Sequence, residues 1–361
     1  MTDTRGFNVL LPAGMSRRAL LQLMGAAAAA SGMGLNRAHA ADPLNLFTWT
    51  TYGDEGFVKF SADHELPIRP TFYSTSDEMV AKLRGGGDAL YDMAVPIQSY
   101  VPLMVELGLI APMDKARVTN TADLYPAFDG TPQWEIDGKF YGAPFVWGAN
   151  AIAYNRAVTG DVDSMDVLFD ERLAGQIGMR DEPEDSLALA ALKLGIKEPY
   201  KMTEEELQEV KKLLISQKPL VRSYWKSIAE VQTMMASGEL AVAWGFLAVV
   251  KPLRDLGIDC GWVWPKEGAI GWNEGIVLLA KSRNKELVED YANLTLSPEY
   301  GKMMGEDTRY ATSSRKAVEQ MDPGLVADLG IDPATMSQLV FKEALPNRAR
   351  WVEVWNEVKN A

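Results

Sequence analysis

Residues 44–55 read LNLFTWTTYGDE. The apolar start, Leu44–Phe47, predicts a β-strand that leads directly into Trp49 and Tyr52. Two aromatic rings placed just after a first strand are either core residues or the floor of a binding site. Because open α/β sheets bind ligands at the carboxyl ends of their strands, the binding site becomes a hypothesis to follow along the chain.

The chain continues as alternating strands and helices. PIRPTFYS (67–74) and LYDMAVP (90–96) predict the second and third strands, and amphipathic helices are expected between the strands. Thr75 and Glu78 have the spacing of a capping box at the start of the second helix. This order of elements predicts an α/β fold built on a doubly wound sheet.

Two long β-rich runs predict a second lobe. FVWGANAIAYN (145–155) and GWNEGIVLLA (271–280) are long enough to cross between domains, and a further α/β unit lies between them. A chain of 361 residues with 47% hydrophobic content can build two cores. We expect two doubly wound lobes with a cleft between them and two hinge crossings. The expected lobes are residues 42–147 plus 272–312, and residues 148–271 plus 313–361.

Residues 1–40 are predicted to be an export signal rather than part of the fold. Arg17 and Arg18 precede a short apolar stretch, and Ala38-His39-Ala40 has the pattern of a cleavage site. The apolar stretch is too short and too rich in Gly and Ala for a stable membrane span. The paired arginines favour the twin-arginine pathway and therefore the periplasm.

Composition excludes several classes of function. A net charge of −13 and a pI near 4.8 argue against nucleic acid or an anionic membrane as the main partner. Cys260 is the single cysteine and His64 the one histidine after residue 40, so neither a disulfide nor a His- or Cys-rich metal site is expected. Cys260 lies in an apolar strand, where an inert thiol is expected. The sequence contains no nucleophile or phosphate-loop motif, so we expect no catalysis, cofactor or metal. We also expect the protein to be a monomer.

Aromatic residues and carboxylates recur at the ends of predicted strands. A desolvated ammonium needs carboxylates to match its charge and aromatic faces to replace its water. A box of this kind would bind an alkyl amine. Acidic residues at a helix start can instead be caps, and a tryptophan at a strand end can be a core residue. The residues concerned are Trp49, Tyr52, Glu182, Glu184, Asp185, Trp244, Trp272 and Glu274.

Taken in order, these segments resemble the periplasmic spermidine/putrescine-binding proteins of ABC transporters. The resemblance covers essentially the whole chain after residue 40. It implies a two-lobed type II binding protein that closes on a small cationic ligand and delivers it to an inner-membrane permease. The segments that carry it are FTWTTY, YDMAVP, YGAPFVWGANAIAYN, DEPED, LAVAWG, VWPKEGAIGWNE and RYATSSRKA.

The resemblance also implies a set of ligand-binding positions. They are Trp49, Tyr52, Glu182, Asp185, Trp244, Trp272, Glu274 and Tyr310.

Four positions depart from the family pattern. Thr51 stands where relatives often carry an acid, Ile97 where a serine is common, and Leu247 where some members have an acid. Arg180 adds a positive charge beside the acidic loop, either as a salt-bridge partner or as a ligand contact. An amine that also carries a carboxylate or hydroxyls, such as an opine or amino acid, is therefore an alternative to a polyamine. An exported enzyme and a metal- or anion-binding member of the fold are further alternatives.

Overall fold

The computed structural model describes residues 42–331, 336 and 339–361 of the chain. The predicted export signal lies outside the described residues. Pro43–Ala361 form one compact unit. Among the described residues, no helix combines the length and apolar character needed to cross a membrane.

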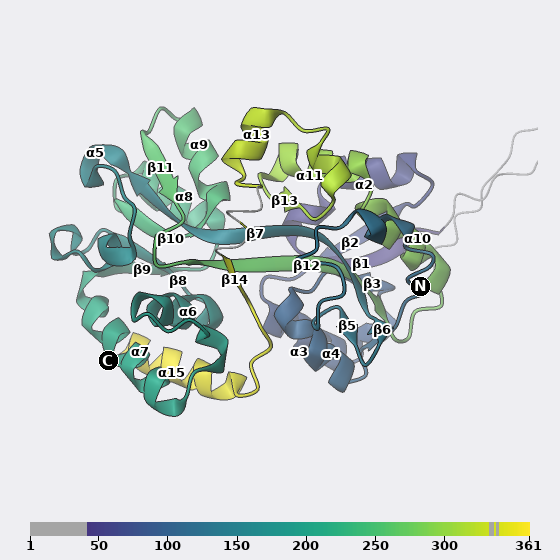
Figure 1. Cartoon of the computed structure of the whole chain (residues 1–361), viewed down its shortest axis with the longest axis horizontal. Helices are drawn as coiled ribbons and strands as arrows, with labels where there is room; N and C mark the ends of the chain where they lie inside the picture. The colour runs from purple at the N-terminus through teal and green to yellow at the C-terminus, as the bar shows by residue number, and fades with distance from the viewer. Residues whose placement is uncertain (1–41, 332–335, 337–338) are drawn as a thin grey trace, which may run out of the picture. The chain divides into compact units, whose positions relative to one another are not determined.

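A mixed sheet of 12 strands organises this unit, with two lobes that share a central pair of strands (Figure 1). Its main path is β2-β1-β3-β12-β7-β10-β8-β9. The strands on that path are β1 (Leu44–Thr48), β2 (Ile68–Phe72), β3 (Met93–Ala94), β7 (Gly142–Asn155), β8 (Ile177–Arg180), β9 (Val221–Trp225), β10 (Val242–Phe246) and β12 (Ala269–Leu279). The shorter strands are β4 (Ile110–Ala111), β5 (Glu135–Ile136), β6 (Lys139–Phe140), β11 (Cys260–Val263), β13 (Ala311–Thr312) and β14 (Leu339–Phe341).

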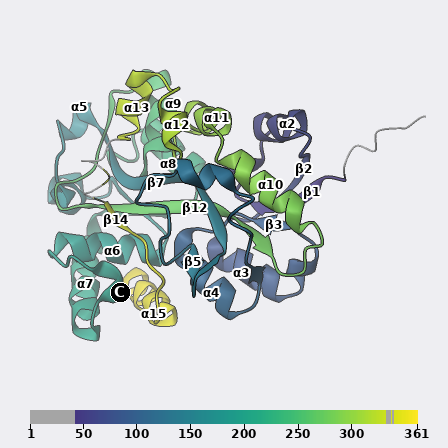
Figure 2. The same cartoon turned by 45° about the vertical axis from the view of Figure 1, so that its right-hand side comes forward.

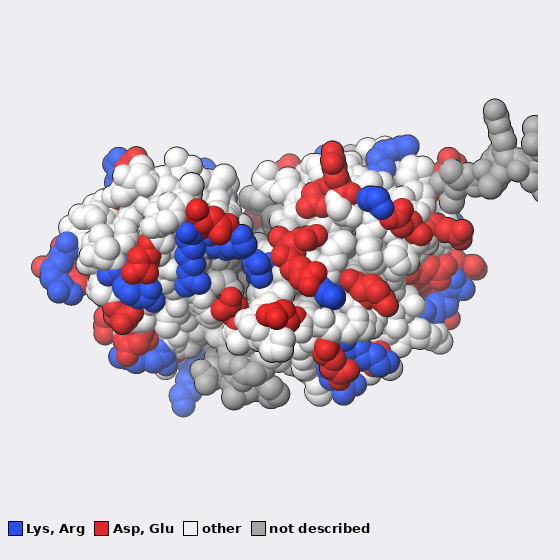
Figure 3. Space-filling model, turned by 90° about the horizontal axis from the view of Figure 1, so that it is seen from above, with Lys and Arg blue, Asp and Glu red and all other residues white. Residues whose placement is uncertain are grey.

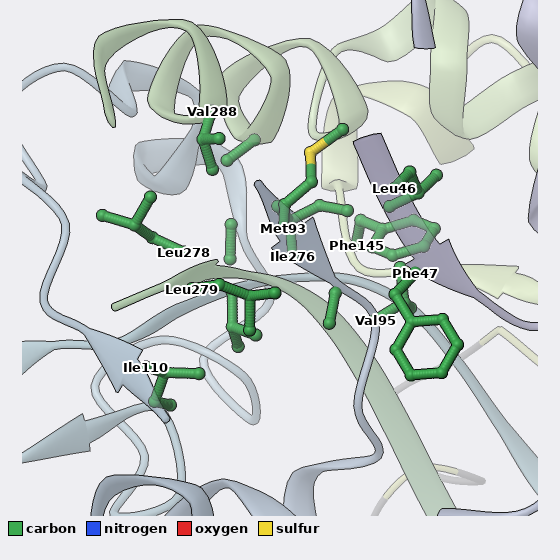
Figure 4. Close-up of a cluster of buried hydrophobic side chains, with 14 of the residues drawn as sticks. Leu46, Phe47, Met93, Val95, Ile110, Phe145, Ile276, Leu278, Leu279 and Val288 are labelled. Carbon is green, nitrogen blue, oxygen red and sulfur yellow. The ribbon is translucent and has the colours of Figure 1, made fainter. Parts of the chain in front are cut away.

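The first lobe contains β1, which pairs in parallel with both β2 and β3. Helices α3 and α4 lie on one side of this part of the sheet, and α2 and α10 on the other (Figures 1 and 2). Leu46, Phe47 and Met93 are fully buried between these layers (Figure 4). The predicted β-α-β-α-β order is confirmed. The helices of this lobe are α2 (Glu55–Asp63), α3 (Ser76–Arg84), α4 (Val101–Glu106), α10 (Lys285–Thr295) and α11 (Pro298–Thr308).

The second lobe repeats the arrangement, because β8 pairs in parallel with both β9 and β10. Helices α6, α7 and α15 lie on one side of these strands, and α8 and α9 on the other (Figures 1 and 2). The helices of this lobe are α6 (Pro183–Lys193), α7 (Glu204–Gln217), α8 (Ile228–Ala236), α9 (Val250–Asp255) and α15 (Arg348–Asn360). Three shorter helices are α5 (Arg156–Thr159), α12 (Arg315–Val318) and α13 (Pro323–Asp328).

The predicted capping box of α3 forms only in part. The Thr75 hydroxyl accepts a hydrogen bond from the Glu78 backbone N–H at 3.1 Å. The Glu78 carboxylate, however, accepts from the backbone N–H of Ser74 at 2.8 Å rather than from that of Thr75. The Glu78 carboxylate therefore binds the N–H of the residue before the N-cap instead of that of the N-cap itself.

The two crossing strands, β7 and β12, run side by side in antiparallel register through the centre of the sheet. Their pairing extends from Gly142–Val277 at one end to Ala149–Gly271 at the other, with an irregularity between Glu274 and Gly275. The predicted crossings are thus confirmed. Both strands serve the two lobes at once, which places their central residues between the lobes.

Charged side chains are spread unevenly over the molecule. On the face shown in Figure 3, acidic side chains are most numerous on the half that contains β1–β3. This distribution accords with the net charge of −13.

Candidate functional site

A cavity of about 460 Å³ lies where the carboxyl ends of the parallel strands of both lobes converge. Trp49–Tyr52 reach it from the end of β1, in the short 3₁₀ helix η1 (Thr50–Gly53). Arg180, Trp225 and Phe246 reach it as the last residues of β8, β9 and β10. Open α/β sheets place their ligand sites at such strand ends, so the position agrees with the expectation from sequence.

Aromatic rings form much of the cavity wall. Trp49 packs against Tyr73, with ring centroids 4.4 Å apart. Trp272 makes an edge-to-face contact with Tyr310 at 4.9 Å and an interplanar angle of 83°. Phe246 meets Trp272 edge to face at 6.1 Å. The two contacts of Trp272 are edge to face and that of Trp49 is tilted by 57°, so each ring is held in a fixed orientation.

Glu274 is the most isolated charge in this cavity. Its side chain is 7% exposed, and its carboxylate accepts a hydrogen bond from the Tyr52 hydroxyl. No Lys or Arg nitrogen among the described residues lies within 4.0 Å of it. Burial raises the pKa of Glu274 to about 7, because the loss of hydration outweighs the hydrogen bond from Tyr52 and the charges of Lys342 and Arg180, which lower it. Burial and the adjacent Glu274 likewise raise the pKa of Tyr52, so the phenol keeps its proton and acts as the donor.

The raised pKa of Glu274 makes the stability of the unliganded protein depend on pH. The unfolded carboxyl ionises near 4.5 and the folded one near 7, so the free energy of unfolding falls as pH rises between these values. Glutamine keeps an acceptor for Tyr52 and carries no charge. We expect unliganded Glu274→Gln to be more stable than wild type at pH 8 by roughly 1–3 kcal/mol, measured by urea unfolding. The gain should disappear at pH 5, and Glu55→Gln on the surface should show no gain at either pH.

A cluster of opposite charges lies at the second-lobe end of the cavity. Arg180 forms an ion pair with Oδ2 of Asp185, and Lys342 forms one with Oδ1 of the same carboxylate. Burial opposes ionisation of Asp185, but the charges of Lys342 and Arg180 outweigh it and lower the pKa of this carboxyl. The Arg180 guanidinium also lies over the Phe246 ring, 4.4 Å from its centroid. Asp185 is therefore an internal counter-ion for two cations that line the cavity.

Glu182 and Glu184 complete this end of the cavity. Glu184 pairs with Arg348 and accepts a hydrogen bond from the Ser99 hydroxyl at 3.3 Å. The nearest cationic nitrogen to Glu182 is that of Arg348, at 3.8 Å. Burial raises the pKa of Glu182 to about 7, against the lowering effect of the Lys342 and Arg180 charges.

Arg348 also connects the two lobes. It lies at the start of α15 and its Nε donates to Asp77 of α3 at 3.0 Å. Its guanidinium stacks over the ring of Tyr100, 4.3 Å from the centroid. Since Arg348 contacts Glu184 on its own side, it bridges carboxylates from both lobes at the rim of the cavity.

Asp185 does not line the cavity, which corrects one expected ligand contact. Pro183 begins α6, so Asp185 falls in the first helical turn rather than in a loop. Its side chain is fully buried and both of its oxygens face cations of the protein. The geometry assigns it to an ion-pair cluster beside the cavity.

Trp244 is a second expected ligand-binding residue that does not line the cavity. It was expected at the end of a strand, but β10 continues for two residues to Phe246. Trp244 is paired with Ile152 inside the sheet and is fully buried in the core of the second lobe. Phe246, one side-chain repeat further along, takes the place at the strand end and lines the cavity.

The other expected residues do meet at the cavity. Glu274 and the aromatic pair Trp272 and Tyr310 approach it from β12 and the loop before β13. The residues expected from the sequence that line it are Trp49, Thr51, Tyr52, Arg180, Glu182, Glu184, Trp272, Glu274 and Tyr310.

Several residues that line the cavity were not expected from the sequence. Trp225 and Phe246 end β9 and β10, so a strict strand-end rule would have found them. Tyr73 follows β2 and could have been found in the same way. Lys342 follows β14, far along the chain from the other charges, and no local pattern indicated it.

Two glycines leave room for tryptophan rings close to the backbone of β7 and β10. A Cβ at Gly148 of β7 would lie 2.4 Å from the Trp272 ring, and one at Gly245 of β10 would lie 2.4 Å from the Trp225 ring. We expect Gly148→Ala to displace Trp272, shift its fluorescence emission and weaken ligand binding by roughly tenfold. The matched control is Gly56→Ala, whose Cβ has no atom closer than 3.4 Å.

Other chemistry-bearing residues lie outside this cavity. Burial raises the pKa of the Cys260 thiol to about 11, which suits an inert core residue. His64 is exposed at the end of α2 and stacks on Phe60. In the part of the chain that the structure describes, no group of three or more His, Cys, Asp or Glu side chains could hold a metal ion.

Two lobes joined by two strand crossings, with a cavity at the carboxyl ends of their strands, define a type II binding protein fold. A family profile described as "Bacterial extracellular solute-binding protein" matches residues 57–330. The chain therefore belongs to the bacterial extracellular solute-binding protein family. This is a family of solute-binding proteins rather than of enzymes.

Individual relatives cover most of the chain. The spermidine/putrescine-binding periplasmic protein of Escherichia coli K12 is 29% identical over 321 residues, which are 85% of this chain and 88% of that protein. The structure of the spermidine/putrescine ABC transporter substrate-binding protein PotD from Streptococcus pneumoniae has a TM-score of 0.76 at 19% identity, covering 89% of this chain and 99% of that one. The structure of MotA from A. tumefaciens B6 in complex with glucopine has a TM-score of 0.74 at 16% identity, covering 88% and 100%.

Proposed function

We propose that this protein is the periplasmic binding component of an ABC importer and that it captures an amine in the cavity between its lobes. Glu274 is the observation that carries the proposal. It is a buried carboxylate with no cationic partner within 4.0 Å among the described residues, and it lies beside Tyr52, Trp272 and Tyr310. An ammonium placed there would supply the missing charge, and the rings would replace its water.

The relatives indicate which amines to consider first. Several curated relatives are named for spermidine, putrescine or cadaverine, so a polyamine is the first class of ligand. Arg180 and Lys342 in the cavity wall favour a second class, an amine that also carries a carboxylate or hydroxyls. A structural neighbour holds glucopine.

Closure of the lobes is the step that a permease would recognise. We propose a first lobe of residues 42–147 plus 272–312 and a second of residues 148–271 plus 313–361, with the hinge in β7 and β12. In this division the ion pair of Arg348 with Asp77 would join the two lobes. A ligand held by Glu274 and by the second lobe would favour the closed state.

Export and assembly follow the same proposal. Residues 1–40 would direct the chain to the periplasm by the twin-arginine pathway, and the protein would act there as a monomer without catalysis. Replacement of Arg17 and Arg18 by lysine should retain the chain in the cytoplasm, as measured by cell fractionation. Export that is unaffected would contradict the twin-arginine route.

Thermal shift against a panel of diamines, triamines, ω-amino acids, opines and betaines tests the amine proposal. A ligand at a hundred times its dissociation constant should raise the free energy of unfolding by about 2.7 kcal/mol. 1,4-Butanediol, which lacks an ammonium, is the matched control and should give no shift. The proposal fails if no amine in the panel stabilises the protein, and turnover of a bound ligand would contradict the absence of catalysis.

A further inference from the structure

The two ends of the cavity differ in charge. At the first-lobe end, Glu274 has the Tyr52 hydroxyl as its partner and no cation within 4.0 Å among the described residues. At the second-lobe end, Arg180 and Lys342 both line the cavity. A ligand in the cavity therefore meets one carboxylate without a close cation and two cations, although the charges of Lys342 and Arg180 also act on Glu274.

Asp185 is the close counter-ion of both cations. Arg180 and Lys342 share a single carboxylate, that of Asp185, which is fully buried and does not line the cavity. Lys342 also lies 3.9 Å from Glu184, which is paired with Arg348, and Glu182 lies in the same cavity wall. Lys342 is 3% exposed, so its charge has little water to screen it.

Both cations keep donors that the protein does not use. A guanidinium has five N–H donors, and the one side-chain hydrogen bond of Arg180 in the described residues is the bond of its Nη1 to Asp185. Lys342 lies 3.9 Å from Glu184, too far for a hydrogen bond, and is within bonding reach of Asp185. Free donors on a planar guanidinium and a nearby ammonium suit the bidentate binding of a carboxylate.

We propose that the ligand is an amine with a carboxylate at its other end, held with its ammonium at Glu274 and its carboxylate at Arg180 and Lys342. The proposal rests on the proposed function and narrows its substrate class. Asp185, which could have received a further ammonium, is occupied by cations of the chain itself. A second ammonium of a diamine would instead lie beside Arg180 and Lys342, whose charges repel it.

Glu182 is the residue that favours a diamine over an amine with a carboxylate. It lines the second-lobe end of the cavity and has no ion pair with Arg180 or Lys342 within 4.0 Å. An ionised Glu182 would attract a second ammonium, whereas a protonated Glu182 could donate a hydrogen bond to a ligand carboxylate. Burial raises its pKa to about 7, so both forms are present at neutral pH. The two ligand classes therefore have to be compared directly.

Calorimetry at pH 7.5 with three probes makes this comparison. 5-Aminopentanoate and putrescine share a four-carbon chain between their charged groups and differ in the second one, and spermidine adds a third amine. We expect the mature protein to bind 5-aminopentanoate at least roughly tenfold more tightly than putrescine, with spermidine weaker still. Tighter binding of putrescine by the wild-type protein would overturn the inference and leave the amine proposal standing.

Substitutions in the cavity wall test where the carboxylate of the ligand binds. Arg180→Gln and Lys342→Gln should each weaken 5-aminopentanoate at least roughly tenfold and leave putrescine equal or tighter. Glu182→Gln is the matched control and should weaken putrescine but not 5-aminopentanoate. Equal losses for both ligands in Arg180→Gln and Lys342→Gln would contradict the assignment. If neither probe nor any other amine binds the wild-type protein, the proposed function itself fails.

Discussion

Glu274→Gln is expected to weaken the binding of the best amine ligand at least roughly tenfold at pH 7.5, and by as much as about a hundredfold. The substitution keeps the shape of the side chain and an acceptor for Tyr52, but it removes the charge that an ammonium needs in a buried site. Calorimetry with the amine that gives the largest thermal shift measures the loss.

The pH dependence of ligand affinity is a second test of the role of Glu274. Because burial raises the pKa of Glu274 to about 7, an ammonium can bind only after the carboxyl has lost its proton. Wild-type affinity should therefore fall as pH drops below 7, by up to about tenfold per pH unit, whereas Glu274→Gln should show no such fall. Glu55→Gln, on the surface of α2, serves as the control and should match wild type. Unchanged affinity in Glu274→Gln would remove this residue from the ligand site.

Asp185→Asn should have the largest effect on stability. The substitution preserves volume but leaves Arg180 and Lys342 without the carboxylate that both of them bind. Removal of one partner from a buried charge cluster typically costs about 3–5 kcal/mol, because the remaining charges stay buried and uncompensated. Urea unfolding at pH 7.5 without ligand measures the cost.

An exposed ion pair provides the contrast. Glu198 pairs with Lys201 at 2.8 Å, and both side chains are more than half exposed. Glu198→Gln should leave the urea midpoint unchanged, since water replaces such a pair at little cost. If Asp185→Asn is as stable as Glu198→Gln, Asp185 is not the counter-ion of the two cations.

Much of the first lobe was predictable because its signals are local. The apolar runs of β1 and β3 and the amphipathic pattern of α3 each lie within about ten residues, and all three elements form where the pattern predicted them. The crossings of β7 and β12 were predictable for the same reason, since each is one uninterrupted β-rich run. The strand-end rule then pointed to Trp49 and Tyr52, whereas Glu274, expected at a strand end, reaches the cavity from the middle of β12.

The errors arose where the outcome depends on exact element ends. A strand two residues longer than expected put Trp244 in the core and Phe246 at the cavity. A helix that begins at Pro183 turned Asp185 inward. Local sequence patterns do not fix element ends to within one residue, yet one residue decides which side chain reaches the cavity.

The sequence by itself determined the α/β order, the two crossings and the presence of rings and carboxylates at strand ends. Only the tertiary structure decided which charges remain available to a ligand. Lys342 lies far along the chain from Asp185, and their contact follows from the packing of the second lobe. This contact occupies one acid of the site, whereas Glu274 has no cation within 4.0 Å among the described residues. Hydrophobic periodicity is a property of neighbouring residues, whereas charge compensation depends on distances between residues that only the folded chain brings together.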